Sequence, residues 1–268
     1  TYMEKRYRRR SLDSVIDEIH RLGTSQVLFV DDNFIGDKQW LHEFLVRIKP
    51  LGLTWHAAVS ADIGKHLSIL DAMKETGCKS LYIGFESINA DSLADVKKSQ
   101  NLVRDYERTI DEIHSREIMI NASMAFGFDC DYPDVFDTSL EWLIRNRIET
   151  MTSHILTPYP GTKLYERLAH EGRIIDDNLS NYNTSKVVFA PKNMTAEQLL
   201  KGYLKIYDDF YSVKSILKRR PLSKRQWIPY FLFNFGYRKY GRMTARIGAL
   251  GHMRLIGKLA RKLSYGIG

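Results

Sequence analysis

Residues 27–33 read Val-Leu-Phe-Val-Asp-Asp-Asn, a short, apolar, β-branched run that ends in three polar side chains. A buried strand of a parallel sheet has this composition, and the loop after it carries the polar groups. Upstream, apolar residues recur at helical spacing over residues 12–22, with Ser11 placed as an N-cap and Gly23 as a stop. The stretch therefore predicts a helix followed by a buried parallel strand.

The same unit recurs along the first 157 residues. Further strands are expected over residues 53–59, 80–85, 118–128 and 152–157, and further helices over residues 40–48, 67–74, 104–115 and 135–145. Strands that alternate with helices of this length pair in parallel through right-handed crossovers. The chain of 268 residues therefore predicts one α/β sheet or barrel with an appendage.

Polar side chains stand where these predicted strands end, which is where α/β folds place their chemistry. They are Asp31, Asp32, Asn33, Ser60, Glu86, Ser87, Asp129 and Thr157. Taken singly each is a weak signal, since Asp and Asn also cap the helix that follows a strand. Together they predict a polar mouth at one end of the barrel.

Several short motifs occur in a fixed order. They are Phe-Val-Asp-Asp-Asn-Phe at residues 29–34, Gly-Cys-Lys-Ser-Leu-Tyr-Ile-Gly-Phe-Glu-Ser at 77–87, Phe-Gly-Phe-Asp at 126–129, Thr-Pro-Tyr-Pro-Gly-Thr at 157–162, Glu-Gly-Arg at 171–173 and Val-Val-Phe at 187–189. This ordered set, spread over about residues 5–220, resembles the radical S-adenosylmethionine superfamily. The resemblance is strongest to members with a cobalamin-binding domain ahead of the barrel.

The resemblance implies a partial parallel (β/α) barrel that lacks its first strand. The sequence pattern changes near Pro191, so the barrel is expected over residues 1–190 and a helical, basic region over residues 191–268. In the family, that first strand leads into a three-cysteine loop that holds a [4Fe–4S] cluster. Here only Cys78 and Cys130 are present, and they cannot replace three clustered thiolates. The missing strand and loop are therefore expected just upstream of Thr1, and no cluster is expected in this chain.

By resemblance, the full-length protein would use S-adenosylmethionine, a [4Fe–4S] cluster and cobalamin, as a methyltransferase or related radical enzyme. The family cleaves S-adenosylmethionine to a 5′-deoxyadenosyl radical, while the protein positions the cofactor. Residues 31–33 would lie near the methionine moiety, and Glu86 and Ser87 near the ribose or amino group. Ser60, Asp129 and Thr157 would complete the cofactor-binding mouth. The chain by itself is not expected to be active.

Two other functions compete with this interpretation. A cluster-free, non-catalytic remnant would fold and bind partners without catalysis. A divalent-metal barrel enzyme would use Asp31, Asp32, Glu86 and Asp129, because carboxylates suit Mg²⁺ or Mn²⁺, although the ordered motifs count against it. His56 is interpreted as a histidine of the barrel lining or core rather than as a general base.

The net charge of +8 is concentrated in residues 211–268, which hold 14 Lys and Arg and no acid. A solvated helical cap, or contact with an anionic membrane surface, explains such a region. Nucleic acid is not favoured, because no nucleic-acid motif accompanies the charge. A small-molecule or lipid-like substrate and a cytoplasmic, membrane-peripheral location are expected, since the longest apolar run, residues 227–235, is too short to span a bilayer.

Overall fold

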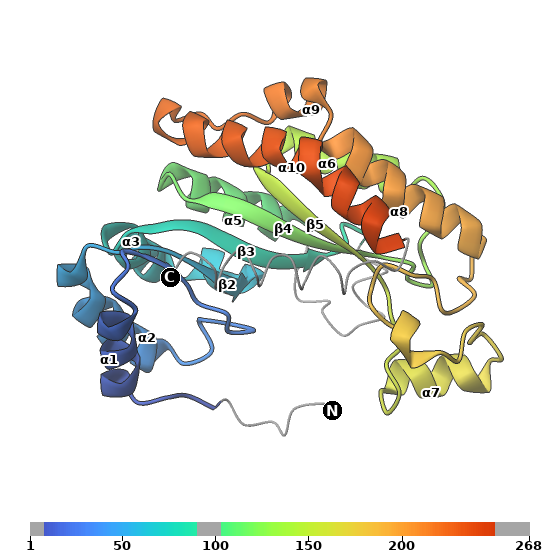
Figure 1. Ribbon diagram of the computed structural model, residues 1–268, viewed down its shortest axis with the longest axis horizontal. Helices are drawn as coiled ribbons and strands as arrows, with labels where there is room; N and C mark the ends of the chain where they lie inside the picture. Colours follow the sequence, from blue (N-terminus) through green and yellow to red (C-terminus); the bar gives the residue numbers. More distant parts are fainter. Residues whose placement is uncertain (1–7, 90–102, 250–268) are drawn as a thin grey trace.

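The computed structural model describes residues 8–89 and 103–249, and its centre is a curved sheet of five parallel strands (Figure 1). The strands lie in the order β1-β2-β3-β4-β5. Their bounds are β1 Gln26–Leu28, β2 Thr54–Ser60, β3 Cys78–Glu86, β4 Met119–Phe126 and β5 Thr150–Ile155. This half-barrel confirms the predicted α/β fold.

Helices connect the strands and continue beyond them. They are α1 Leu12–Leu22, α2 Lys38–Ile48, α3 Leu67–Glu75, α5 Val103–Ser115, α6 Val135–Arg145, α7 Lys163–His170, α8 Ala196–Phe210, α9 Val213–Lys218 and α10 Trp227–Ala249. Short 3₁₀ turns are η1 Lys49–Leu51, η2 Ala61–Lys65, η3 Leu179–Asn181 and η4 Lys224–Gln226. Local signals set several ends: Ser11 caps α1, Gly23 ends it with φ 58°, and Thr195 forms a capping box with Gln198 at α8.

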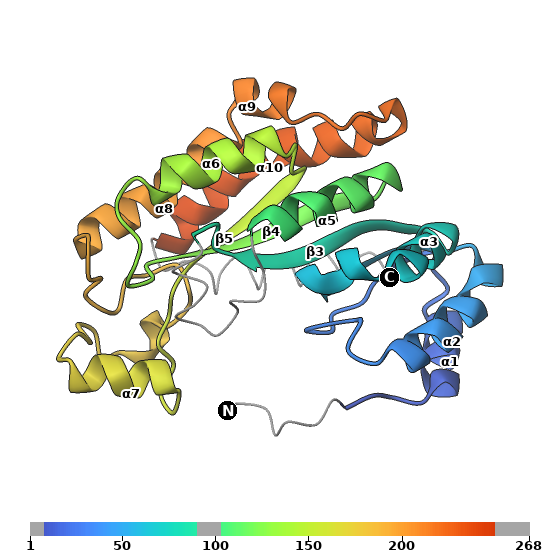
Figure 2. The ribbon, with the colours of Figure 1, turned by 180° about the vertical axis from the view of Figure 1, so that it is seen from behind.

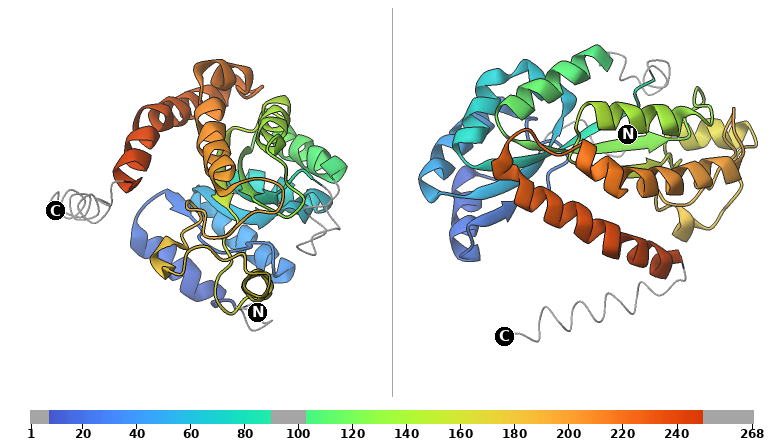
Figure 3. Two further views of the ribbon diagram at one scale, coloured as in Figure 1. Left: turned by 90° about the vertical axis from the view of Figure 1, so that its right-hand side faces the viewer. Right: turned by 90° about the horizontal axis from the view of Figure 1, so that it is seen from above.

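Side chains alternate between two faces of the sheet. On β3, Leu81, Ile83 and Phe85 are fully buried, and the Phe85 ring lies 4.9 Å from Tyr106 on α5 and 5.4 Å from Trp142 on α6. The intervening β3 residues are half-buried and face the concave side. The core therefore lies between the convex face and helices such as α5 and α6, whereas α10 lies on the opposite side (Figures 2 and 3).

The edge of the sheet at β5 is closed by two tyrosines of the segment that ends α8. The Tyr207 hydroxyl accepts a hydrogen bond from the Ser153 amide at 2.8 Å and donates to the Ser153 carbonyl at 3.1 Å. The Tyr211 hydroxyl does the same with Met151, at 3.3 and 3.0 Å. Backbone groups that a further strand would use are thus satisfied.

The edge at β1 differs. Among the described residues β1 pairs only with β2, and the side chains of Leu28 and Val30 are 65% and 85% exposed. A cavity of about 480 Å³ between β1 and α1 adjoins this edge. An edge with exposed apolar side chains is a template for pairing with another strand.

The C-terminal helices are anchored by Arg219, which follows α9 and is fully buried. Its guanidinium donates to the carbonyls of Ile148, Glu149 and Phe210 at 2.6, 2.9 and 2.8 Å, and to the Asn234 side chain at 3.2 Å. Burial lowers the pKa of Arg219 to about 10. One side chain therefore joins α8 and α10 to the segment that begins β5.

A buried pair of His114 and Glu149 predicts a pH dependence of stability. The two side chains lie 3.2 Å apart, and Glu149 also accepts from the Ile120 amide at 2.9 Å. Burial disfavours the charged imidazole, but the charge and hydrogen bond of Glu149 outweigh it, so the pKa of His114 is raised. A raised pKa adds stability below the unfolded value of about 6.5, and this is lost as pH rises through the folded value.

We therefore expect His114→Gln to lower the free energy of unfolding most at acidic pH, and progressively less as the pH rises. Urea unfolding of the wild type and the variant at about pH 5.5 and about pH 8.5 measures the difference on either side of the unfolded pKa. An equal loss of unfolding free energy at both pH values would show that the pKa of His114 is not raised in the folded protein.

Candidate functional site at the carboxyl ends of the strands

The concave face of the half-barrel is lined by half-buried polar side chains from four strands. They are His56, Ser80, Tyr82, Asn121, Thr152 and His154. The His56 Nδ1 lies 2.6 Å from the Ser80 hydroxyl, and the Tyr82 hydroxyl lies 3.3 Å from the His154 Nε2. The Thr152 hydroxyl donates to the Asn121 side chain at 3.2 Å. These bonds join adjacent strands, except the Tyr82–His154 bond, which reaches from β3 to β5.

Both histidines of this face are biased towards the neutral form. Burial lowers the pKa of His56. Burial also lowers the pKa of His154, with the charge of Glu86 acting in the opposite direction, and the His154 Nδ1 lies 3.2 Å from the Thr184 hydroxyl. The location of His56 agrees with the lining position expected from the sequence. The sequence pattern did not identify Tyr82 and His154 as site residues, although both lie on the predicted strands.

Glu86 ends β3 in a left-handed backbone conformation, with φ 67°. Its carboxylate folds back over Gly84, where a Cβ atom would lie only 2.5 Å from the Glu86 Oε1. Since Gly84 belongs to the half-buried, concave-facing positions of β3, the carboxylate lies on the concave side at the carboxyl end of the sheet. A left-handed non-glycine residue costs roughly 1 kcal/mol or more and often marks a functional position.

Asn33 and Ser60 lie together. The Asn33 side-chain oxygen accepts from the amides of Ser60 at 3.1 Å and Ile35 at 3.4 Å, which fastens the loop after β1 to the end of β2. The Ser60 hydroxyl in turn bonds to Asp62. Asp31 and Asp32 are exposed, and Asp31 lines the cavity between β1 and α1. The loop after β1 therefore presents two carboxylates beside the open edge.

Ser87 and Thr157 stand at strand ends as expected, but their hydroxyls bond to nearby backbone. The Ser87 side chain is buried and accepts from the Asn89 amide at 3.0 Å. The Thr157 hydroxyl donates to the Ile155 carbonyl at 3.0 Å. In this arrangement both side chains shape the turns that follow β3 and β5.

Asp129 is held by two arginines. Its carboxylate lies 2.8 Å from Arg167 on α7 and 2.7 Å from Arg173. Burial opposes ionisation, but the hydrogen bond and charge of Arg173, with the charge of Arg167, lower the pKa of Asp129. Sequence reasoning missed the neighbouring Asp131, which is buried and accepts from the amides of residues 127 and 128 at 2.9 and 3.0 Å.

Comparisons with known proteins identify relatives of this chain. It is 32% identical over 247 residues to a bacteriochlorophyllide d C-12(1)-methyltransferase of Chlorobaculum tepidum, covering 89% of this chain and 54% of that protein. It is 26% identical over 181 residues to a hopanoid C-2 methylase of Rhodopseudomonas palustris, covering 64% of this chain and 34% of that protein. Residues 162–228 match a family described as a domain of unknown function, DUF4070.

The fold has a counterpart among solved structures. The radical S-adenosylmethionine methyltransferase TsrM of Kitasatospora setae, with cobalamin and a [4Fe–4S] cluster bound, superimposes with a TM-score of 0.53. The match covers 60% of this chain and 32% of that chain at 18% identity. The chain belongs to the radical S-adenosylmethionine superfamily.

As a radical S-adenosylmethionine superfamily member, the chain spans about half the length, or less, of the curated relatives it matches. Its own residues do not fit an iron–sulfur cluster. Cys78 begins β3, is fully buried, and burial raises the pKa of its thiol, whereas Cys130 follows β4 at the other end of the sheet. Two thiols at opposite ends of parallel strands cannot share one cluster.

The carboxylates at the strand ends do not assemble into a metal centre. Within residues 8–89 and 103–249, no three His, Cys, Asp or Glu side chains are grouped as metal ligands. Asp129, which the metal hypothesis required, is neutralised by Arg167 and Arg173. These contacts do not favour a divalent-metal barrel enzyme.

Proposed function

We propose that this chain is the barrel portion of a cobalamin-dependent radical S-adenosylmethionine methyltransferase with an apolar, polycyclic methyl acceptor. The observation that carries the proposal is the relation to the Chlorobaculum tepidum bacteriochlorophyllide methyltransferase, because it spans 89% of this chain. The name of the hopanoid C-2 methylase supports methyl transfer and an apolar acceptor. Cobalamin is proposed because the TsrM structure contains it.

The concave face would hold S-adenosylmethionine at the carboxyl ends of the strands. A carboxylate accepts hydrogen bonds from ammonium and hydroxyl groups, which is the chemistry of the amino acid and ribose parts of the cofactor. Glu86 has this chemistry. Gly84 has no side chain, which leaves room on the concave face for the Glu86 carboxylate. When bound to a cluster, S-adenosylmethionine supplies the radical chemistry of the superfamily, while these residues hold and orient it.

The open edge of β1 supports a first strand contributed from outside residues 1–268. The exposed apolar side chains of Leu28 and Val30 and the adjoining cavity give such a strand a surface on which to pair and pack. That strand would carry the cluster loop to the same end of the sheet as Asp31 and Glu86, because parallel strands share one direction. The cluster and cobalamin would thus be held by parts of the protein beyond this chain.

The experiment that tests the site measures S-adenosylmethionine affinity in the cluster-loaded protein encoded by the whole gene. We expect Glu86→Gln to weaken binding about tenfold, since a charge-assisted hydrogen bond is replaced by a neutral one. The melting temperature should change little, because Glu86 is half-buried and glutamine has the same shape.

Glu141→Gln on α6 is the matched control, since Glu141 is exposed and lies on a convex-side helix. It should bind S-adenosylmethionine like the wild type. Equal affinities in all three proteins would remove Glu86 from the cofactor site. A cluster-loaded wild type that binds no S-adenosylmethionine would overturn the proposed function itself.

The non-catalytic remnant is the second candidate, and the observation that favours it is the placement of Cys78 and Cys130 at opposite ends of the sheet. It becomes the better account if the gene encodes no cysteine loop ahead of these residues. The radical enzyme predicts about four irons per chain in the whole gene product, whereas the non-catalytic remnant predicts only background iron.

A further inference from the structure

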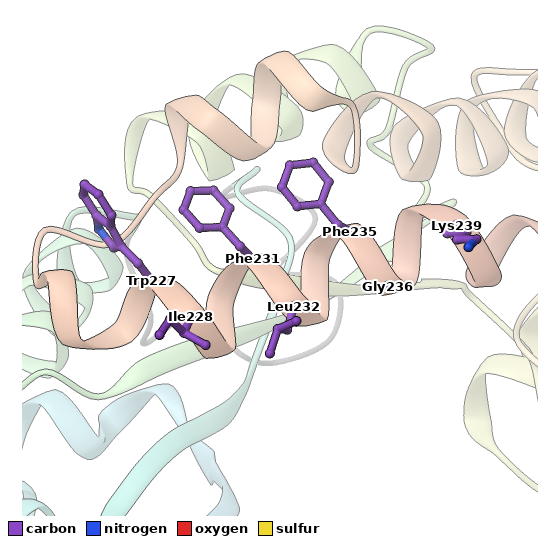
Figure 4. A pocket seen from close by; sticks show the side chains of 7 residues that line it. All are labelled: Trp227, Ile228, Phe231, Leu232, Phe235, Gly236 and Lys239. Atoms are coloured by element: carbon purple, nitrogen blue, oxygen red, sulfur yellow. The ribbon is translucent and has the colours of Figure 1, made fainter.

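The helix α10 presents an apolar groove on its surface (Figure 4). The groove has a volume of about 620 Å³ and is lined by Trp227, Ile228, Phe231, Leu232, Phe235, Gly236 and Lys239. The rings of residues 227, 231 and 235 point to the same side of the helix, whereas Ile228 and Leu232 point to another. Ile228 and Leu232 are 74% and 71% exposed.

This groove is not the face by which α10 is attached to the barrel. Attachment uses Tyr230, whose hydroxyl donates to the Ile216 carbonyl at 2.6 Å, and Asn234, whose amide donates to the Glu149 carbonyl at 3.2 Å. Tyr237 packs on Tyr211, with ring centroids 4.2 Å apart. Ile228 and Leu232 therefore project from a helix that other residues hold in place, and large exposed apolar patches mark interaction sites.

Lys239 lines the groove, and further cations lie on the segments that precede it in the sequence. Exposed lysines and arginines of this region are Lys214, Lys218, Arg220, Lys224, Arg225 and Lys239. Residues 211–268 contain no Asp or Glu to balance them. Glu117 lies close enough to Arg225 to feel its charge, so the cations of this region are in excess rather than unopposed. A surface that combines exposed aliphatic and aromatic side chains with an excess of cations is complementary to an anionic lipid surface.

We propose that residues 213–241 form a docking surface for an anionic membrane, with Ile228 and Leu232 entering the interface and exposed cations such as Lys224 and Arg225 contacting lipid phosphates. No helix in the described part of the chain is long and apolar enough to cross a bilayer. A symmetric contact with a second copy would place these cations against each other, because the same patch meets itself. Charge therefore favours lipid over self-association.

The test uses residues 1–268 and sedimentation with vesicles of phosphatidylcholine, with or without phosphatidylglycerol. We expect binding to the anionic vesicles at low salt, release as salt rises, and little binding to pure phosphatidylcholine. Ile228→Gln/Leu232→Gln and Lys224→Glu/Arg225→Glu should each weaken binding by about tenfold or more, since the first removes insertion and the second reverses two contacts.

Matched controls come from α1 and α2. Val46→Gln on α2 changes another exposed apolar residue, and Arg21→Glu/Lys38→Glu makes the same change of net charge on α1 and α2. Both should bind like the wild type. A loss of binding in Arg21→Glu/Lys38→Glu equal to that in Lys224→Glu/Arg225→Glu would show that binding depends on net charge alone and would overturn the docking surface.

Insertion has its own readout at Trp227. Brominated lipid should quench its fluorescence on binding, whereas the buried Trp55 and Trp142 should be unaffected. Trp227→Phe should remove the quenching and keep most of the binding. Absence of binding to anionic vesicles at low salt would refute the proposal, as would a dimer that only Ile228→Gln/Leu232→Gln dissociates. These outcomes do not depend on methyltransferase activity.

Discussion

Arg219→Met lowers the free energy of unfolding by about 3 kcal/mol or more, because it removes a buried cation that donates to three backbone carbonyls. The carbonyls of Ile148, Glu149 and Phe210 would each lose a charged donor. The guanidinium also lies 3.5 Å from the centre of the Phe210 ring, so its removal opens a gap against an aromatic face.

Urea unfolding measures the loss, with Arg220→Met as the control. Arg220 is exposed, and its substitution should change stability by less than about 0.5 kcal/mol. Arg219→Lys should fall between the two, since an ammonium keeps the charge but not the planar fork that reaches several carbonyls. Similar stabilities for Arg219→Met and Arg220→Met would contradict the anchoring role of Arg219.

The parallel sheet and its helices were predictable because their signals are local. Ser11 and Gly23 bound α1 through a side-chain cap and a left-handed residue, as the sequence predicts, and Thr195 with Gln198 forms a similarly local capping box at the start of α8. The strand at residues 118–128 proved shorter, because Gly127 turns the chain with φ 103° and Asp131 binds the amides of that turn. Asp131 lies four residues after Gly127, outside the apolar pattern of the strand, so that pattern could not reveal its role.

The strand-end residues were predictable as a group, but their individual bonds were not. Position in the sequence placed Glu86, Ser87 and Asp129 at the carboxyl ends of strands. Which of them faces the concave side depends on contacts with distant residues, such as Arg173 for Asp129. The bond between Tyr82 and His154 joins residues 72 positions apart, so no local pattern reveals it.

The basic region shows the same limit. Composition indicated a run of cations, and a solvated helical cap was one interpretation. Composition does not reveal that Arg219 is buried while Arg220 beside it is exposed. That difference arises because Arg219 lies where α8, α10 and the segment before β5 pack together.

Residues 1–268 alone should bind no stoichiometric [4Fe–4S] cluster, whereas the protein encoded by the whole gene should bind one. A cluster of this type needs clustered thiolates, and the chain offers only Cys78 and Cys130 at opposite ends of the sheet. A thiol that is fully buried in the core, as at Cys78, is also a poor ligand, because burial favours its protonated form.

The placement of the cluster site outside residues 1–268 is tested most directly by the iron content of these two proteins after anaerobic incubation with iron and sulfide. We expect background iron in residues 1–268 and about four irons per chain in the whole gene product, with a cluster signal by electron paramagnetic resonance after reduction. A stable four-iron cluster in residues 1–268, or none in the whole gene product, would contradict this placement.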